Sequence, residues 1–152
     1  MSISRRSFIG YLSLPVAVAS IAPAAIATAA GPIRQPTTGD AAQFMVRAAE
    51  MRQYAVDSGD QAFGAVVVKS GRIVGQAPSR VIVNHDPTAH AEMEAIRDAA
   101  RRLGTNDLSD CVIYSTSRPC RMCETAGYWA NLARSYSGEI IIDNGRPRYP
   151  SC

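Results

Sequence analysis

The sequence predicts an α/β protein with a mixed sheet of about four to five strands covered by helices. Helical and strand patterns follow one another in the order α-β-β-α-β-α-β, and such an order is typical of a mixed sheet with helical layers. The expected strands are short, apolar and rich in β-branched residues. With 152 residues, 47% hydrophobic and 19% charged, the chain has the length and composition of one globular domain.

The first predicted elements are a helix over residues 40–57 and a hairpin that follows it. The helix carries apolar side chains at helical spacing on one face, namely Phe44, Ala48, Met51 and Ala55. A β-branched run predicts a strand over residues 63–69. Ser70-Gly71 then predicts a tight turn into a second strand over residues 72–76.

A second helix is expected to begin at Asp86-Pro87, because aspartate is a favoured N-cap and proline a favoured first helical residue. Gly104 is expected to end this helix, since glycine is the commonest residue just past a helix C-terminus. The apolar residues 81–83 before it are too few to decide between a short strand and the edge of a loop.

The second half of the domain is expected to contain two more strands around a third helix. The apolar run over residues 111–115 predicts a buried strand, and Pro119 predicts the start of a helix over residues 119–131. Residues 135–142 predict a further strand, broken at Gly138. Residues 144–152 are expected to be irregular, because they contain two prolines and a glycine.

Two motifs, His90-Ala91-Glu92 and Pro119-Cys120-Arg121-Met122-Cys123, predict a zinc site. One imidazole and two thiolates are ligands that Zn²⁺ favours, and three protein ligands leave a fourth position for water. Residues two apart on a helix point about 200° apart, so His90 and Glu92 reach one ion only if the helix approaches it end-on. Two helix N-termini are therefore expected to meet at the metal, where their positive ends would favour thiolate.

The chemistry expected from this set is hydrolytic deamination of an aminated heterocycle. Zinc lowers the pKa of a bound water to about 7, and Glu92 is expected to move that proton to a ring nitrogen; a second proton then passes through the same carboxylate to the amine, which leaves as ammonia. The pairing of H-x-E with P-C-x-x-C is the signature of zinc-dependent deaminases.

Two other interpretations of these motifs stay open. The ion could be structural, with His85 as a fourth ligand, or the CxxC pair could form a redox disulfide. The first leaves Glu92 without a role, and the second leaves both His90 and Glu92 without one.

Several further residues receive ordinary structural interpretations. Glu50 and Glu94 are expected to be solvated helix charges, and Cys111 a small core residue. Tyr128 and Trp129 are expected to pack in the core at the end of the third helix.

The strings N-H-D-P-T-A-H-A-E (84–92) and R-P-C-R-M-C (118–123) resemble the cytidine and deoxycytidylate deaminase superfamily. They are most similar to the branch holding guanine deaminases and tRNA adenosine deaminases, as is F-G-A-V at 63–66, while Y-W-A at 128–130 resembles the guanine deaminases. The resemblance covers roughly residues 40–142. It implies a three-layer α/β/α sandwich, usually a homodimer, with Zn²⁺ on His90, Cys120 and Cys123, and Glu92 as the proton shuttle.

The resemblance also marks candidate substrate contacts and departures. Ala91, Ser79 and Trp129 stand at candidate substrate-binding positions, but Ser79 replaces an asparagine that is common in the family. Arg118 stands where this branch usually has glutamate, and Arg121 replaces a frequent proline. The chain also ends soon after its last predicted strand, where relatives continue.

The function expected from the resemblance is deamination of a small nucleobase or nucleoside, with guanine the best single candidate. The alternatives are an enzyme like the tRNA adenosine deaminases and a non-catalytic zinc-binding relative. No nucleic-acid partner is expected, because residues 31–152 carry 14 basic and 13 acidic side chains.

Residues 1–30 predict a signal peptide, residues 31–39 a linker and residues 40–152 the catalytic domain. Arg5-Arg6 with Phe8, ahead of an apolar stretch ending in A-T-A, resembles a twin-arginine signal. A periplasmic or exported protein with no membrane contact after cleavage is expected. A transmembrane anchor is the alternative, although Pro15 and Pro23 disfavour it.

Overall fold

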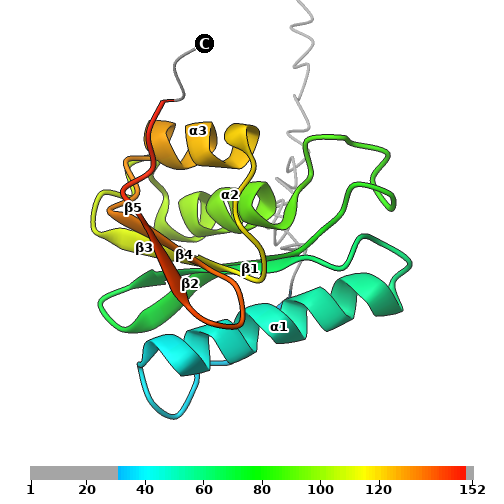
Figure 1. Ribbon diagram of the computed structural model, residues 1–152, viewed down its shortest axis with the longest axis horizontal. Coiled ribbons are helices and arrows are strands. Elements are labelled where there is room, and N and C mark those ends of the chain that lie inside the picture. Colours follow the sequence, from blue (N-terminus) through cyan, green and yellow to red (C-terminus); the bar gives the residue numbers. More distant parts are fainter. Residues whose placement is uncertain (1–30, 150–152) are drawn as a thin grey trace, which may run out of the picture.

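Three helices and five strands form one mixed sheet with helices on both faces in the computed structural model, which describes residues 31–149 (Figure 1). In chain order they are α1 (Ala41–Asp57), β1 (Gly64–Lys69), β2 (Arg72–Pro78), α2 (Ala91–Leu103), β3 (Cys111–Ser115), α3 (Arg121–Trp129), β4 (Arg134–Ser137) and β5 (Ile142–Gly145). α1 covers one face of the sheet, and α2 and α3 cover the other (Figure 1). The α/β fold with a mixed sheet is confirmed.

The predicted signal peptide (1–30) and Cys152 lie outside the described residues. Among the helices that are described, none combines the length and apolar character needed to cross a membrane.

The strands lie in the order β2-β1-β3-β4-β5. β1 pairs antiparallel with both β2 and β3, β3 and β4 are parallel, and β5 pairs antiparallel with β4. Parallel neighbours need a crossover connection, and α3 forms the one between β3 and β4. This crossover brings the N-terminus of α3 to the end of β3.

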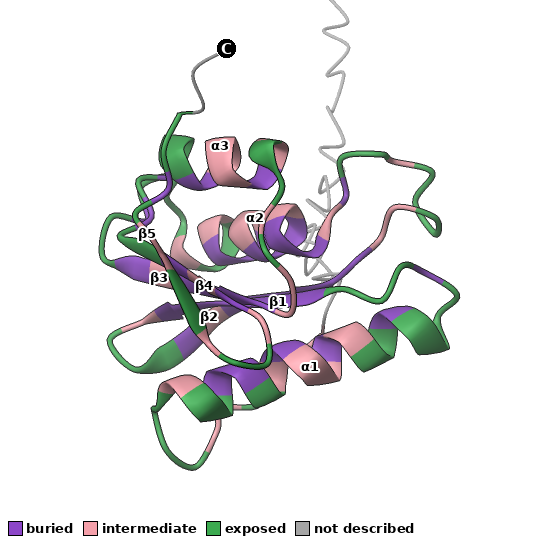
Figure 2. Ribbon diagram, in the orientation of Figure 1, coloured by how far each residue is buried: buried purple, intermediate pink, exposed green. Residues whose placement is uncertain are grey.

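The interior strand β1 is buried on both faces, which explains why its sequence is continuously apolar rather than alternating. Ala65 and Val67 belong to the core beneath α2, whereas Val66 and Val68 belong to the core beneath α1. The buried colouring of β1 and of the inward sides of α1 and α2 follows these two layers (Figure 2). On α1, the predicted apolar face is confirmed, and Asp40 caps the helix by accepting a hydrogen bond from the Gln43 N–H.

The contact between β2 and α2 depends on a glycine. A Cβ at Gly75 would lie 2.6 Å from the carbonyl oxygen of Ala95 and 2.6 Å from the amide nitrogen of Ala99. Because both atoms are backbone atoms of α2, the helix itself would have to move.

We expect Gly75→Ala to lower the free energy of unfolding by about 1–3 kcal/mol, the usual cost of overpacking a core. Urea unfolding measures the change, and Arg72→Ala at the exposed start of β2 is the control, with an expected effect within about 0.5 kcal/mol. Equal stability of Gly75→Ala and the wild type would contradict the close approach of α2.

The predicted start of the second helix is wrong by four residues. Asp86 does accept hydrogen bonds from the backbone and hydroxyl of Thr88, and the Ala89 N–H closes one turn onto the Asp86 carbonyl. The backbone then becomes extended at His90, which is the N-cap of α2. The hydrogen bonds of Asp86 therefore stabilise an isolated turn, and the helix begins only at Ala91. The predicted end at Gly104 is confirmed, with a left-handed backbone there.

Other boundaries also differ from the predictions. The third helix covers only Arg121–Trp129, with Cys120 as its N-cap. The strand predicted over residues 135–142 is instead a hairpin of β4 and β5, because Gly138 turns the chain at a φ of 83°. β5 therefore takes in Asn144 and Gly145 from the segment predicted to be irregular, and residues 81–83 lie in a turn.

Residues 31–39 are irregular, as expected for a linker, but they are tied to β2. The Gln35 side-chain amide donates to the Ile73 carbonyl and its oxygen accepts from the Ile73 N–H. Gln76 donates to the Pro32 carbonyl. This segment consequently follows the edge strand of the sheet.

Candidate functional site

The three predicted zinc ligands lie together. The Sγ atoms of Cys120 and Cys123 are each 3.7 Å from His90 Nδ1 and 3.6 Å from one another. A tetrahedral ion with Zn–S bonds of about 2.3 Å and a Zn–N bond of about 2.0–2.1 Å requires separations of about 3.5–3.8 Å. The donor atoms therefore fit a single zinc ion by both chemical type and spacing.

Two helix N-termini supply these ligands. His90 is the N-cap of α2 and Cys120 the N-cap of α3, and both have extended backbones. Neither side chain makes a capping hydrogen bond to a backbone N–H of its helix, so both are available as ligands. Cys123 follows in the first turn of α3. The predicted end-on convergence of two helices is thus present.

The thiol of Cys123 lies in surroundings that oppose its ionisation. Burial raises the pKa of this thiol, and the Glu92 carboxylate and Cys120 raise it further. Binding of a cation would therefore have to displace the thiol proton.

Glu92 is held beside the ligands with one oxygen anchored. Its side chain is buried, and Oε1 accepts a 2.7 Å hydrogen bond from the hydroxyl of Ser115 at the end of β3. Oε2 lies 3.5 Å from Cys123 Sγ. A carboxylate fixed in this way can exchange protons with a group at the metal without leaving its place. Ser115 is not among the predicted site residues, because its only signal in the sequence is a polar residue at the end of an apolar strand.

We expect Ser115→Ala to reduce the kcat of a reaction that depends on proton transfer by Glu92 by about 10- to 100-fold with little change in KM, because a hydrogen bond to a charged group contributes about 1.5–3 kcal/mol. Ser115→Thr retains the hydroxyl and should restore most of the rate. Both variants should keep their zinc, which metal analysis would check. An unchanged kcat in Ser115→Ala would show that Glu92 needs no such anchor.

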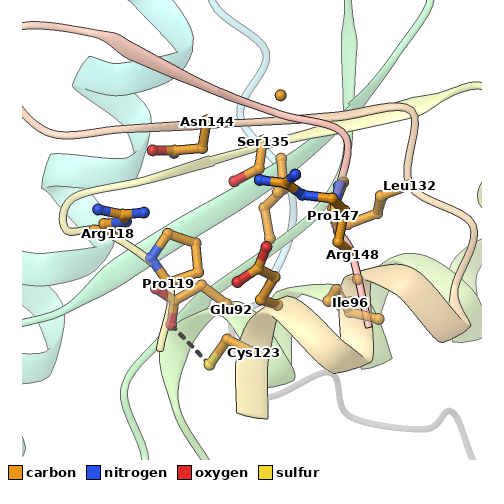
Figure 3. Close-up of a pocket in the computed structure, with 14 residues that line it drawn as sticks. Glu92, Ile96, Arg118, Pro119, Cys123, Leu132, Ser135, Asn144, Pro147 and Arg148 are labelled. Carbon is orange, nitrogen blue, oxygen red and sulfur yellow. Dashed lines mark hydrogen bonds between the residues drawn. The ribbon is translucent and has the colours of Figure 1, made fainter. Parts of the chain in front are cut away.

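A pocket opens beside Glu92 and Cys123 (Figure 3). We call it the Glu92 pocket. Apolar side chains of α2, β3, the loop after α3 and the final segment form part of its wall: Ile96, Ile113, Leu132 and Pro147. Its polar lining consists of Arg118, Glu124, Ser135, Asn144 and Arg148. An apolar wall with a few polar groups suits an aromatic ring bearing hydrogen-bonding substituents.

The three candidate substrate contacts lie outside the lining of the Glu92 pocket. Ala91 is buried between His90 and Glu92, and Ser79 is buried just after β2. Trp129 is 69% exposed at the end of α3.

The interpretation of Tyr128 and Trp129 as core residues is wrong. Tyr128 is also exposed, and the two rings make edge contacts with one another and with Tyr149. Gly127 in the last turn of α3 is buried, whereas these two rings lie on the exposed side of the helix. They surround a separate hollow on the outer side of α3.

Burial and spacing also describe the residues of the other interpretations. Within residues 31–149, the group with metal-binding spacing consists of the three ligands alone, and His85 lies exposed in a turn. Cys120 and Cys123 are free thiols, and Cys111 is a buried core residue as predicted. Glu94 is not solvated, since it is buried and paired with Arg97 at 2.5 Å.

Comparison with known proteins agrees with this geometry. Residues 38–139 match the family described as the cytidine and deoxycytidylate deaminase zinc-binding region. A guanine deaminase of Bacillus subtilis is 44% identical over 88 residues, which are 57% of this chain and 56% of that protein. A tRNA-specific adenosine deaminase of Aquifex aeolicus is 43% identical over 83 residues, covering 55% of each chain. The chain thus spans a little over half the length of these two relatives.

Solved structures show the same fold. The guanine deaminase structure from Bacillus subtilis has a TM-score of 0.63 at 39% identity, covering 65% of this chain and 64% of that one. A structure from studies of A-to-I editing by tRNA:A34 deaminases has a TM-score of 0.61 at 36% identity, covering 62% and 69%. The chain belongs to the cytidine and deoxycytidylate deaminase zinc-binding family.

Proposed function

We propose that this protein is a zinc-dependent hydrolase that deaminates a small aminated nucleobase or nucleoside and releases ammonia. The observation that carries the proposal is the anchored Glu92 carboxylate beside a His/Cys/Cys set with zinc spacing. Zinc bound there supplies Lewis acidity, which lowers the pKa of a coordinated water to about 7.

The side chains of the site transfer protons, orient the carboxylate and hold the ring. Glu92 accepts one proton of the attacking water and passes it to a ring nitrogen, then takes the second proton from the added hydroxyl and delivers it to the amine, which leaves as ammonia. Ser115 keeps the carboxylate in one orientation during both transfers. The walls formed by Ile96, Ile113 and Leu132 exclude water from the ring and fix its plane.

Guanine is the first candidate ring, because a guanine deaminase is among the relatives and the charge of residues 31–152 is close to neutral. The tRNA-specific relatives support a second candidate, adenosine in tRNA. A non-catalytic zinc-binding role is the third.

Ammonia release by the zinc-loaded protein from guanine, cytosine, adenine, their nucleosides and a tRNA distinguishes these candidates. Release from a free base or nucleoside is expected. Release from tRNA alone would favour the second candidate, and one zinc per chain without ammonia from any of these would favour the third.

We also propose export through the twin-arginine route and a homodimeric state. The first rests on Arg5-Arg6 and Phe8 and the second on the family resemblance. Fractionation of cells expressing the tagged full chain tests the first, with Arg5→Lys and Arg6→Lys together expected to block export. Sedimentation of the mature protein tests the second.

A further inference from the structure

A buried carboxylate holds the loop that leads to the candidate metal ligand His90. Asp60 lies in the turn between α1 and β1 and is 8% exposed. Its Oδ2 atom accepts hydrogen bonds of 2.9 Å from the backbone N–H groups of both Ile82 and Val83. Its Oδ1 atom accepts one of 2.8 Å from the Gln61 N–H. The carboxylate therefore joins its own turn to the loop between β2 and α2.

The bonds to this loop are those of a charged group. Burial raises the pKa of the Asp60 carboxyl, but the hydrogen bonds from the backbone N–H groups outweigh it and hold the pKa below its ordinary value. Asp60 is consequently ionised at neutral pH. An ionised carboxylate is purely an acceptor, and its bonds to N–H groups are stronger than those of a neutral oxygen.

Residues 80–89 form a compact loop whose two ends are joined by a hydrogen bond. The Arg80 N–H donates to the Ala89 carbonyl at 2.9 Å, and the Asn84 N–H donates to the Arg80 carbonyl at 3.0 Å. Ala89 is fully buried, and His90 follows it directly. A displacement of the loop would therefore be passed to the backbone of His90.

The His90 imidazole depends on this backbone for its orientation. Its Nδ1 atom faces the thiols of Cys120 and Cys123, but within residues 31–149 its Nε2 atom has no hydrogen-bond partner. In most metal sites a carboxylate, a carbonyl or a water accepts a hydrogen bond from the second ring nitrogen and fixes the ring. The chain that carries the ring has to supply this constraint here, and that chain is the loop held by Asp60.

Asp60 is itself attached to a regular element. Its backbone N–H donates to the Ala55 carbonyl in the last turn of α1 at 2.9 Å. The turn after α1 and the loop after β2 both extend beyond the same end of the sheet (Figure 1). The connection from Asp60 to His90 therefore passes around the end of the sheet and does not depend on packing through β1.

We propose that Asp60 is a positioning residue for the metal site: it holds residues 80–89 in the shape that presents His90 and thereby sets the affinity of the site for zinc. This inference rests on the zinc site of the proposed function. Asp60 belongs neither to the His/Cys/Cys set nor to the lining of the Glu92 pocket, so it acts only through the loop. Removing a group that orients a metal-binding histidine typically weakens metal affinity by about 10- to 100-fold.

The zinc affinity of the full chain, measured by competition with a chromophoric chelator, tests the proposal. Asp60→Asn replaces one accepting oxygen by an NH2 group, so it should weaken zinc binding by about 10-fold or more. Asp107→Asn is the matched control, because Asp107 also accepts a hydrogen bond from a loop N–H, that of Ser109, but after the C-terminus of α2. Both variants should melt at a lower temperature without zinc, whereas only Asp60→Asn should bind zinc more weakly.

Saturation with zinc distinguishes positioning from catalysis. Asp60→Asn should regain the wild-type kcat for ammonia release at saturating zinc, because Glu92 and its pocket are unchanged. Equal zinc affinity of Asp60→Asn and the wild type would overturn the proposal, and so would an equal loss of affinity in Asp107→Asn. A wild type that binds zinc without releasing ammonia would reject the proposed deamination, and the comparison of zinc affinities would still decide the role of Asp60.

Hydrogen exchange tests the same coupling without a substitution, and it decides the matter if Asp60→Asn does not fold. Coupling between two sites is reciprocal, so a loop that sets zinc affinity is itself stabilised when zinc binds. The Ile82 and Val83 amides should exchange more slowly with zinc than without it, while the Ser109 amide should exchange at the same rate. Exchange at Ile82 and Val83 that does not respond to zinc would refute the coupling.

Discussion

Glu92→Gln is expected to lower kcat for deamination by about 10²- to 10⁴-fold while the protein keeps one zinc per chain. The amide has nearly the shape of the carboxylate and can still contact Ser115, but it cannot accept the proton of the attacking water. Ammonia release and metal analysis on the same preparation measure both quantities.

Glu94→Gln is the matched control for this change. Glu94 lies on the same helix and is buried like Glu92, but it pairs with Arg97 instead of facing the ligands. It should keep its zinc and most of its activity. Full activity in Glu92→Gln would exclude Glu92 as the proton shuttle, and loss of zinc from that variant would assign it a metal-binding role instead.

Cys123→Ser is expected to lose stoichiometric zinc and to unfold at a lower temperature than the wild type. The ligand is buried and links the first turn of α3 to the N-cap of α2, so metal binding also holds the two helix ends together. With free zinc about 1,000-fold above its dissociation constant, binding contributes about 4 kcal/mol to the free energy of unfolding.

A chelator reveals whether this loss arises from the metal. Thermal unfolding with and without chelator should shift strongly for the wild type and hardly at all for Cys123→Ser. Cys111→Ala provides the control, because Cys111 is equally buried but distant from the ligands, and it should keep the response to chelator. An unfolding temperature of the wild type that does not change with chelator would show that metal binding contributes nothing to stability.

The parts of the fold that could be predicted from sequence depend on local patterns. The apolar face of α1, the β1–β2 hairpin and the left-handed end of α2 at Gly104 each follow from a few neighbouring residues, and each is confirmed. The start of α2 is different, because Asp86 forms its capping bond to Thr88 and the chain still leaves the helical path before His90. A local signal cannot show that a helix stops after one turn.

The candidate site divides in the same way. The three candidate metal ligands stand in two short motifs, so their types and spacing predicted the cluster of side chains that the structure contains. Ser115, Ser135 and Arg148 carry no motif, and they reach Glu92 or its pocket only through strand pairing and the path of the final segment. Their contribution depends on contacts between residues far apart in sequence. Such contacts cannot be recognised from a single sequence.

The two-sided burial of β1 makes this strand a partition between two chemically different halves of the domain. Val66 and Val67 are neighbours in the chain, but the first packs in the layer of α1 and the second in the layer that carries the zinc ligands. A change of side-chain volume at position 66 therefore alters packing against α1 and not against α2. The same change at position 67 alters packing against α2, the helix that begins after His90 and carries Glu92. The α1 layer can accordingly vary in sequence without readjusting the chemistry on the other side of the sheet.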